Sequence, residues 1–124
     1  MKRPVPISGL GHLRVVIDQD VYVGPGRADL LERIAGMGSI SAAGKSMGMS
    51  YKRAWGLVQA LNEGFGAPLV ETVRGGTRQG GARLTDLGLA VLNHYRAMEA
   101  KTETAIAGDV EALRALKSDI AERK

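Results

Sequence analysis

The segment from Ser41 to Asn62 constrains the fold most, because it predicts two short helices joined by a turn of only a few residues. Ser41 is expected to cap a helix that ends near Met47, and Gly48 is a typical stop for such a helix. Ser50 is then expected to cap a second helix that runs to about Asn62. Two helices around a tight, glycine-containing turn are the layout of a helix-turn-helix.

The second of these helices is predicted to have two contrasting faces. At about 100° per residue, the apolar residues cluster on one side and should be buried: they are Ala54, Leu57, Val58 and Leu61. The opposite side is polar or small: it carries Lys52, Gly56, Gln59 and Glu63, with Arg53 at its shoulder. Tyr51 and Trp55 lie on a flank, and we expect Trp55 to pack against the protein because its body is apolar.

The polar face of this helix has the chemistry that reads DNA. Lys52 or Arg53 can donate to O6 and N7 of guanine, and Gln59 can pair with N6 and N7 of adenine. A small residue such as Gly56 lets the backbone approach the groove, and Ser50 at the helix N-terminus suits a phosphate. An ordinary amphipathic helix with a solvated outer face is the alternative. The short helix before it and the hairpin after it favour DNA reading.

A glycine-rich hairpin is predicted after this helix. Leu69 to Val73 and Ala82 to Leu84 are expected to form two strands, with a long, flexible loop from Arg74 to Gly81 between them. Arg74, Arg78 and Arg83 would suit the DNA backbone or a narrow minor groove. No Lys-Ser or Lys-Thr pair follows the loop, so it is a poor match to a nucleotide-binding P-loop. A surface loop without function is the alternative.

The remaining segments complete a mainly α fold with small β-hairpins. Residues 1–12 are expected to be a flexible N-terminus, followed by a strand over Leu13–Asp18, a return strand over Val21–Val23 and a helix from Arg27. Thr85 is expected to cap a long helix to about Ala107, after which Gly108 interrupts and a last helix begins. We therefore expect a winged helix-turn-helix domain over residues 13–84 and C-terminal dimerisation helices over residues 85–124.

The positive charge of the chain is concentrated in residues 39–83, which hold the predicted helix-turn-helix and the hairpin and are called the reading unit below. The whole chain has 124 residues and a formal net charge of +4. Six cations and only two acids lie between residues 39 and 83, which gives the same +4: the cations are Lys45, Lys52, Arg53, Arg74, Arg78 and Arg83. Basic charge placed in this way favours a nucleic-acid partner.

Other classes of function have little support in the sequence. No cysteine is present, which excludes disulfides and thiolate metal sites. The two histidines, His12 and His94, are far apart, and no paired-carboxylate or Ser/His/Asp pattern occurs. We expect no catalytic residues, no cofactor and no metal. No apolar run is long enough to span a membrane, and a cytoplasmic protein is expected.

Several motifs together resemble the N-terminal domain of the molybdate-responsive ModE-type regulators. These motifs are Gly38-Ser39-Ile40-Ser41-Ala42-Ala43, Ser50-Tyr51-Lys52-Arg53-Ala54-Trp55, Leu69-Val70-Glu71-Thr72 and the paired glycines that precede Ala82-Arg83-Leu84-Thr85. The first motif and the Leu84-Thr85-x-x-Gly88 pattern are also similar to the LysR-type DNA-binding domain. The resemblance runs from about Leu13 to Ala107.

This resemblance implies a DNA-binding transcription regulator that dimerises through its terminal helices and binds a palindromic operator. Together with the residue chemistry, it gives the expected DNA-binding residues: Ser41, Ser50, Tyr51, Lys52, Arg53, Gln59, Arg74, Arg78 and Arg83. ModE-type regulators also carry a C-terminal molybdate-binding β-barrel. The sequence after Thr85 is helical and leaves no room for it, so we do not expect this polypeptide to sense molybdate.

Two other readings remain open from the sequence. One is a protein-interaction module that uses a winged-helix scaffold without binding DNA. The other is a nucleoid-type protein that binds DNA without sequence preference. The exposed cations at Lys52 and Arg53 and in the hairpin argue against the first, and only binding measurements separate the second from a specific regulator.

Overall fold

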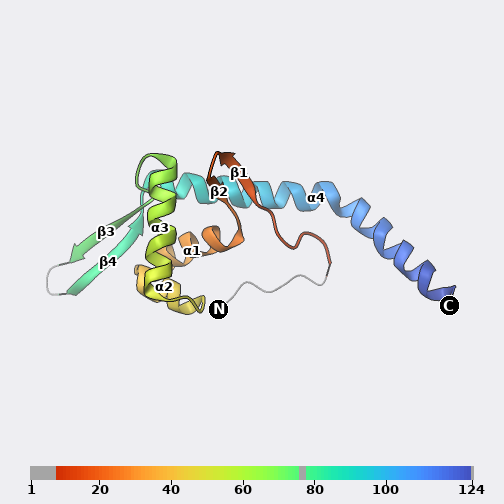
Figure 1. Cartoon of the computed structure of the whole chain (residues 1–124), viewed down its shortest axis with the longest axis horizontal. Coiled ribbons are helices and arrows are strands. Elements are labelled where there is room, and N and C mark those ends of the chain that lie inside the picture. Colours follow the sequence, from red (N-terminus) through yellow and green to blue (C-terminus); the bar gives the residue numbers. More distant parts are fainter. Residues whose placement is uncertain (1–7, 76–77, 124) are drawn as a thin grey trace.

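The fold is a winged helix-turn-helix followed by one long helix (Figure 1). The computed structural model describes residues 8–75 and 78–123, with the backbone alone for residues 74–75 and 78–80. In chain order the elements are β1 (Val15–Asp18), β2 (Val21–Val23), α1 (Pro25–Met37), α2 (Ile40–Ser46), α3 (Tyr51–Phe65), β3 (Val70–Gly75), β4 (Arg78–Leu84) and α4 (Asp86–Glu122). The predicted fold class, mainly α with two small antiparallel hairpins, is confirmed.

An aliphatic core joins the three short helices to the second hairpin. Its fully buried members come from the three helices and from the residue just before β3: they include Leu30, Leu31, Ile34, Ala43, Ala54, Leu61 and Leu69. From α4, Tyr95 is also fully buried, and its hydroxyl donates a hydrogen bond of 2.6 Å to the carbonyl of Leu13. Removal of this apolar surface from water is the main force that holds the elements together.

The turn between α2 and α3 is built on a close helix contact at Gly44. A Cβ atom at this position would lie 2.7 Å from Cβ of Ala54, so only glycine lets the two helices approach to this distance. Gly48 then adopts a left-handed φ of 74°, and the amide of Met49 donates back to the carbonyl of Gly44. Ser50 caps α3 as predicted, and the helix continues to Phe65, three residues beyond the predicted end.

The N-cap of α2 differs from the prediction. Ser39 is the cap: its hydroxyl accepts a hydrogen bond of 3.1 Å from the amide of Ala42. Ser41 lies inside the first turn of α2 and is exposed, so its predicted role as the cap is wrong. Both serines are good capping residues. Ser39 is the cap because α2 begins at Ile40, whose side chain is buried, two residues before the predicted start.

The second hairpin is more regular than the sequence predicts. β4 begins at Arg78 and pairs with β3 from Gly75↔Arg78 to Val70↔Leu84, with an irregularity between Val73 and Gly75. The predicted long loop over residues 74–81 is therefore wrong for most of its length. Glycine is disfavoured in the interior of a strand, but Gly81 is required here because a Cβ atom would lie 2.7 Å from the carbonyl oxygen of Gly38.

A single helix replaces the two predicted C-terminal helices. α4 is continuous from Asp86 to Glu122 and extends well beyond the other elements (Figure 1). Thr85 caps it as predicted, through a hydrogen bond from the amide of Gly88. The predicted interruption at Gly108 is wrong. This residue is exposed, and glycine in a solvated helix interior costs only about 1 kcal/mol relative to alanine, which the flanking helix formers absorb.

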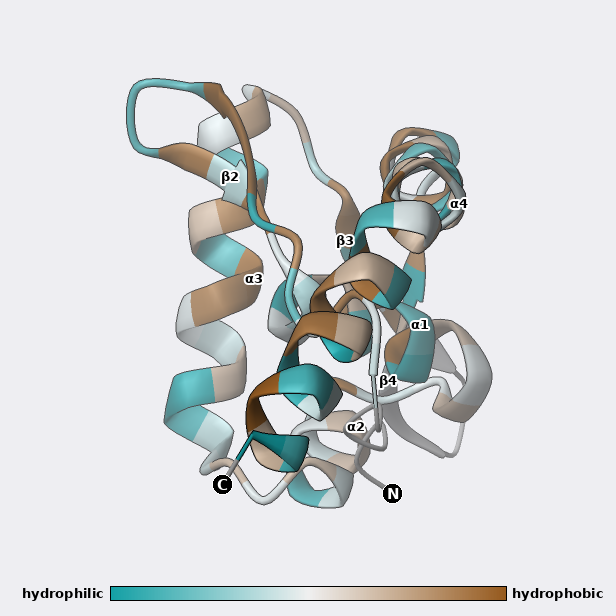
Figure 2. Ribbon diagram, turned by 90° about the vertical axis from the view of Figure 1, so that its right-hand side faces the viewer, coloured by the Kyte–Doolittle hydropathy of each residue, from teal (hydrophilic) through white to brown (hydrophobic). Residues whose placement is uncertain are grey.

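The first hairpin is confirmed, and it lies against the C-terminal end of α3. Its tip is hydrophilic and its two strands are hydrophobic (Figure 2), and Val21 packs against Gly64 of α3. α1 begins at Pro25, two residues before the predicted start, since proline is tolerated in the first turn of a helix. Of the predicted flexible N-terminus, residues 1–7 lie outside the described part of the chain.

Gly44 of α2 and Gly108 of α4 should respond to alanine in opposite directions. Gly44→Ala is expected to destabilise the protein by about 1–3 kcal/mol, because its methyl group overlaps Ala54. Gly108→Ala should stabilise it by about 0.5–1 kcal/mol, because α4 is continuous there and the site is open. Urea unfolding at one fixed protein concentration measures both. A destabilised Gly108→Ala would contradict a continuous α4.

A second pair of substitutions tests the cap of α2. Ser39→Ala removes a hydrogen bond to an otherwise unpaired helix amide and should cost about 1 kcal/mol. Ser41→Ala replaces an exposed serine within the helix and should change the free energy of unfolding by less than about 0.5 kcal/mol. Thermal unfolding followed by circular dichroism measures the difference. Equal losses from the two variants would show that the cap is assigned incorrectly.

Candidate nucleic-acid interface

The N-terminal half of α3 presents the predicted reading residues to solvent. The Ser50 hydroxyl accepts from the amide of Arg53 at 3.1 Å, which fixes the first turn of the helix. The opposite face is anchored in the core, because Ala54, Val58 and Leu61 are buried. As a result the polar side chains are held outward on a rigid element: Tyr51, Lys52, Arg53 and Gln59 are all exposed.

An open hollow of about 440 Å³ lies on this outer face of α3. It is lined by Ser50, Lys52, Arg53, Gly56 and Leu57. A Cβ atom at Gly56 would meet nothing within 4 Å, so the helix backbone itself is accessible at this point. The first-turn amides of a helix carry partial positive charge, and here they lie beside two cationic side chains. The hollow is thus suited to an anionic or hydrogen-bond-accepting surface.

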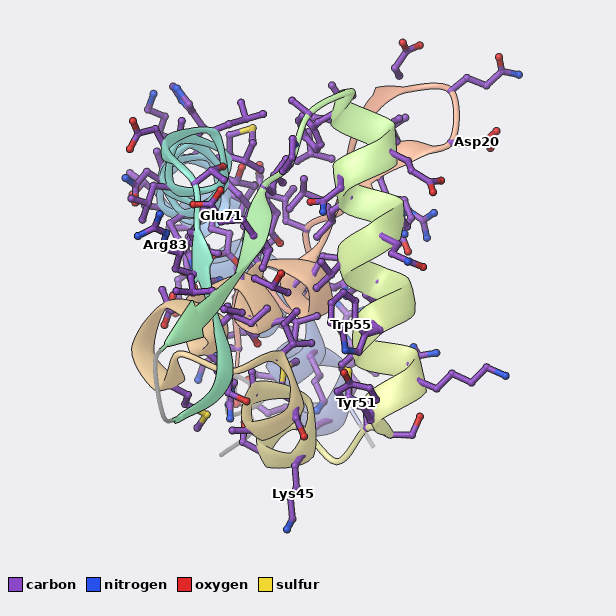
Figure 3. All side chains as sticks on the ribbon, turned by 90° about the vertical axis from the view of Figure 1, so that its left-hand side faces the viewer. Asp20, Lys45, Tyr51, Trp55, Glu71 and Arg83 are labelled. Carbon is purple, nitrogen blue, oxygen red and sulfur yellow. The ribbon has the colours of Figure 1, made fainter. Side chains whose placement is uncertain are left out.

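Trp55 is a packing residue, as predicted. Its ring is partly buried against the core, and Tyr51 meets it edge to face with ring centroids 6.0 Å apart. Tyr51 itself is 58% exposed, so it shields one side of the indole while remaining available at the surface. Figure 3 shows the two rings on the flank of α3 that faces α2, with Lys45 of α2 at the same end of the molecule.

Among the hairpin arginines with a described side chain, Arg83 is not brought together with the α3 face. Arg83 lies opposite Glu71 on the neighbouring strand and donates from Nε to its carboxylate at 2.8 Å. This pair lies far from Lys45 and Tyr51 (Figure 3). The side chains of Arg74 and Arg78 lie outside the described part of the chain. Their backbone places them near the tip of the hairpin, at its last described pairs.

One residue of the site, Asn62, was missed in the sequence. Its side-chain oxygen accepts from the amides of Leu69 and Val70 at 2.8 and 3.3 Å, and its side-chain nitrogen donates to the carbonyl of Val70 at 3.3 Å. It therefore fastens the root of the hairpin to α3. The only signal for this role was an asparagine near the end of a helix, a residue type that readily bonds to nearby backbone groups.

The described residues hold neither a metal-binding cluster nor a membrane-spanning helix. Within residues 8–75 and 78–123, no group of three or more histidine, aspartate or glutamate side chains is placed to hold a metal ion. No helix in this part of the chain is long and apolar enough to cross a membrane.

The sequence of the reading unit matches a known family of regulators. Residues 27–89 match the family described as bacterial regulatory helix-turn-helix proteins, LysR family. This match covers about half of the chain and runs from α1 through the second hairpin into the first turn of α4. It thus contains both α3 and the hairpin.

Two curated relatives and one solved structure extend the comparison. The molybdenum-pterin-binding protein MopA of Rhodobacter capsulatus is 42% identical over 84 residues, which cover 68% of this chain and 32% of that protein. The DNA-binding transcriptional dual regulator ModE of Escherichia coli K12 is 39% identical over 83 residues, which cover 67% and 32%. Full-length CbnR, solved with its target DNA, superposes with a TM-score of 0.48 at 26% identity, over 73% of this chain and 27% of that one.

The predicted resemblance is therefore confirmed in the reading unit. The chain spans about a third of the length of the curated relatives it matches. The matched part contains the capped helix α3, its outward cations and the hairpin beside it. The chain belongs to the bacterial regulatory helix-turn-helix proteins of the LysR family, and the part that contains α3 and the second hairpin is similar to MopA and ModE.

Proposed function

We propose that this chain is a transcription regulator that binds double-stranded DNA in a sequence-specific manner, with α3 in the major groove. The observation that carries the proposal is the outward face of α3, where Ser50, Lys52, Arg53 and Gln59 surround an open backbone at Gly56. A helix of this kind reads base edges with its N-terminal residues. Chromosomal DNA as the target would place the protein in the bacterial cytoplasm.

The side chains divide into base-reading and backbone-binding groups. Arg53 and Lys52 would donate to guanine, and Gln59 would pair with adenine. Ser41, Ser50 and Tyr51 would position the helix on the phosphates, and the hairpin would add Arg74 and Arg78 beside the neighbouring groove. Arg83 can join them only by leaving Glu71. Both side chains of that pair are largely exposed, so it is worth no more than about 1 kcal/mol and a phosphate can compete with it.

We further propose that two copies pair through α4 and bind a palindromic operator. Leu113, Leu116 and Ile120 are each more than half exposed on the projecting half of this helix. Its other half borders an apolar groove of about 220 Å³, which Leu87, Val91 and Met98 line together with the first hairpin. Met98 and Leu116 point to the same side, since they are separated by about five turns at 3.6 residues per turn. A two-fold dimer would cover both halves.

Removal of single arginines tests the DNA surface. Arg53→Ala is expected to weaken operator binding by about 1–3 kcal/mol and to relax the base preference at one position. Arg78→Ala should weaken binding to all DNA sequences equally and should flatten the dependence of the binding affinity on salt concentration. The measurements are gel shifts over a salt series, on operators selected from random DNA with and without molybdate. We expect the same sites in both selections.

The matched control for this experiment is Arg123→Ala, which removes one exposed cation far from α3. The affinity of this variant for the operator should equal that of the unaltered protein. If neither Arg53→Ala nor Arg78→Ala changes binding, the assigned surface is wrong. A protein without DNA affinity at low salt would instead be an interaction module, and one that random DNA displaces completely would be a nucleoid-type binder.

The dimer is tested by the mass of the protein in solution. Light scattering at micromolar concentration should give twice the mass of one chain, and Leu116→Glu with Ile120→Glu should give a single chain, because both charges would be buried in the interface. Val16→Glu is the matched control: this apolar residue is 66% exposed on β1 but lines neither the apolar groove nor the projecting half of α4, and the variant should remain dimeric. A monomeric unaltered protein would refute the proposed dimer.

A further inference from the structure

Arg96 of α4 lies at the centre of three carboxylates. Its guanidinium is 2.6 Å from Asp29 and 3.0 Å from Glu32 of α1, and 2.9 Å from Glu99, one turn later in α4. A planar guanidinium presents several donors in fixed directions, so three acceptors around it define the orientation of the group. Arg96 therefore connects α4 to α1 in one particular arrangement.

The contacts of Arg96 are shielded from water to different degrees. The side chains of Asp29 and Glu99 are 13% and 9% exposed, whereas that of Glu32 is 62% exposed. Burial opposes the charged form of Arg96, but the hydrogen bonds that it donates to Asp29 and Glu99, together with the negative charge of Glu32, outweigh this effect and raise its pKa above the usual value. The arginine is thus a permanent cation, and its two shielded partners contribute most of the orientation.

A second arginine continues this connection from α1 to α2. Arg33 donates to the hydroxyl of Ser46 at 2.9 Å, and this hydroxyl in turn donates to the carbonyl of Ala43 at 2.7 Å. Residues 29, 32 and 33 lie on one side of α1, because positions three and four apart share a helix face. Together with Arg96 they line one polar cleft of about 260 Å³. The polar side of α1 thus links α4 to the end of α2, which packs directly on α3.

We propose that Arg96 is a positioning residue that sets the angle between α4 and the reading helix α3, and thereby the spacing of the two operator half-sites. The inference rests on the proposed dimeric DNA binding. In a dimer built on α4, the angle at this joint determines where each α3 lies relative to the two-fold axis. Apart from the hydrogen bond of the Tyr95 hydroxyl to Leu13, the contacts around Tyr95 are apolar and non-directional, whereas the ion pairs of Arg96 are directional and resist rotation of α4 against α1.

The length of α4 makes the spacing of the two half-sites sensitive to the angle that Arg96 sets between α4 and α1. The end of α4 at Glu122 lies about 39 Å from Arg96 along the helix, at about 1.5 Å per residue. A rotation of about 10° at Arg96 would displace it by about 7 Å, which is about two base-pair steps of roughly 3.4 Å. Buried ion pairs of this type are retained in some proteins for the structural specificity that they provide.

The test measures binding to DNA that carries two half-sites whose separation is changed one base pair at a time, and to DNA with a single half-site. Arg96→Lys keeps the charge but loses the planar fork. We expect it to bind a single half-site within about twofold of the unaltered protein and to lose about tenfold of its preference for the best separation. Asp29→Asn should shift the preference in the same direction, and Glu32→Gln should change it little.

The controls separate positioning from stability and from the proposed function itself. Arg114→Lys alters an exposed arginine of the same helix, paired with Glu111 at 3.8 Å, and should leave the preferred separation unchanged. Circular dichroism tests whether each variant is folded. If Arg96→Lys does not fold, the separation profile of Asp29→Asn is the test of the inference. An unchanged separation profile in the folded variant overturns the inference. If the unaltered protein shows no preference for paired half-sites, the proposed dimeric function fails and this inference fails with it.

Discussion

The contact between Gly44 and Ala54 is the constraint on which the reading unit depends. Two helix backbones can approach this closely only where neither helix presents a larger side chain, and this approach places α3 on the core with its polar side outward. The short turn at Gly48 and the caps at Ser39 and Ser50 then follow from local backbone requirements. The exposed cations of α3 are held in place by the burial of the opposite face of the same helix.

Much of this fold could be predicted because its signals are local. Capping serines, a glycine stop and a 3.6-residue apolar period lie within a few residues of one another, and they located α3 and its two faces. The error in the second hairpin arose because a distant segment decides the outcome there. Gly81 belongs to a strand because the carbonyl of Gly38 lies against it, and no pattern near residue 81 carries that information. At Gly108 a weak local preference was overridden by its neighbours.

The same distinction applies to the candidate site. The outward residues of α3 could be named from a helical wheel, since they share one short helix. Asn62 and Arg96 could not, because their roles exist only when separate elements meet: Asn62 bonds to the first residues of the hairpin, and Arg96 bonds to a helix more than sixty positions earlier. In sequence, a charged residue on a long helix is indistinguishable from a solvated one. Only the positions of the surrounding residues in the folded structure show what such a residue does.

The position of Asn62 has a consequence for how such a regulator can diverge. Its hydrogen bonds attach the hairpin to the last turns of α3, whereas most of the α3 residues that we propose to contact DNA lie in the first turns, around Ser50 and Arg53. Substitutions in the first turns therefore leave the attachment of the hairpin intact. Under the proposed mode of DNA binding, a lineage of these proteins can acquire a new target sequence through a few residues of one helix turn while it inherits the rest of the molecule unchanged.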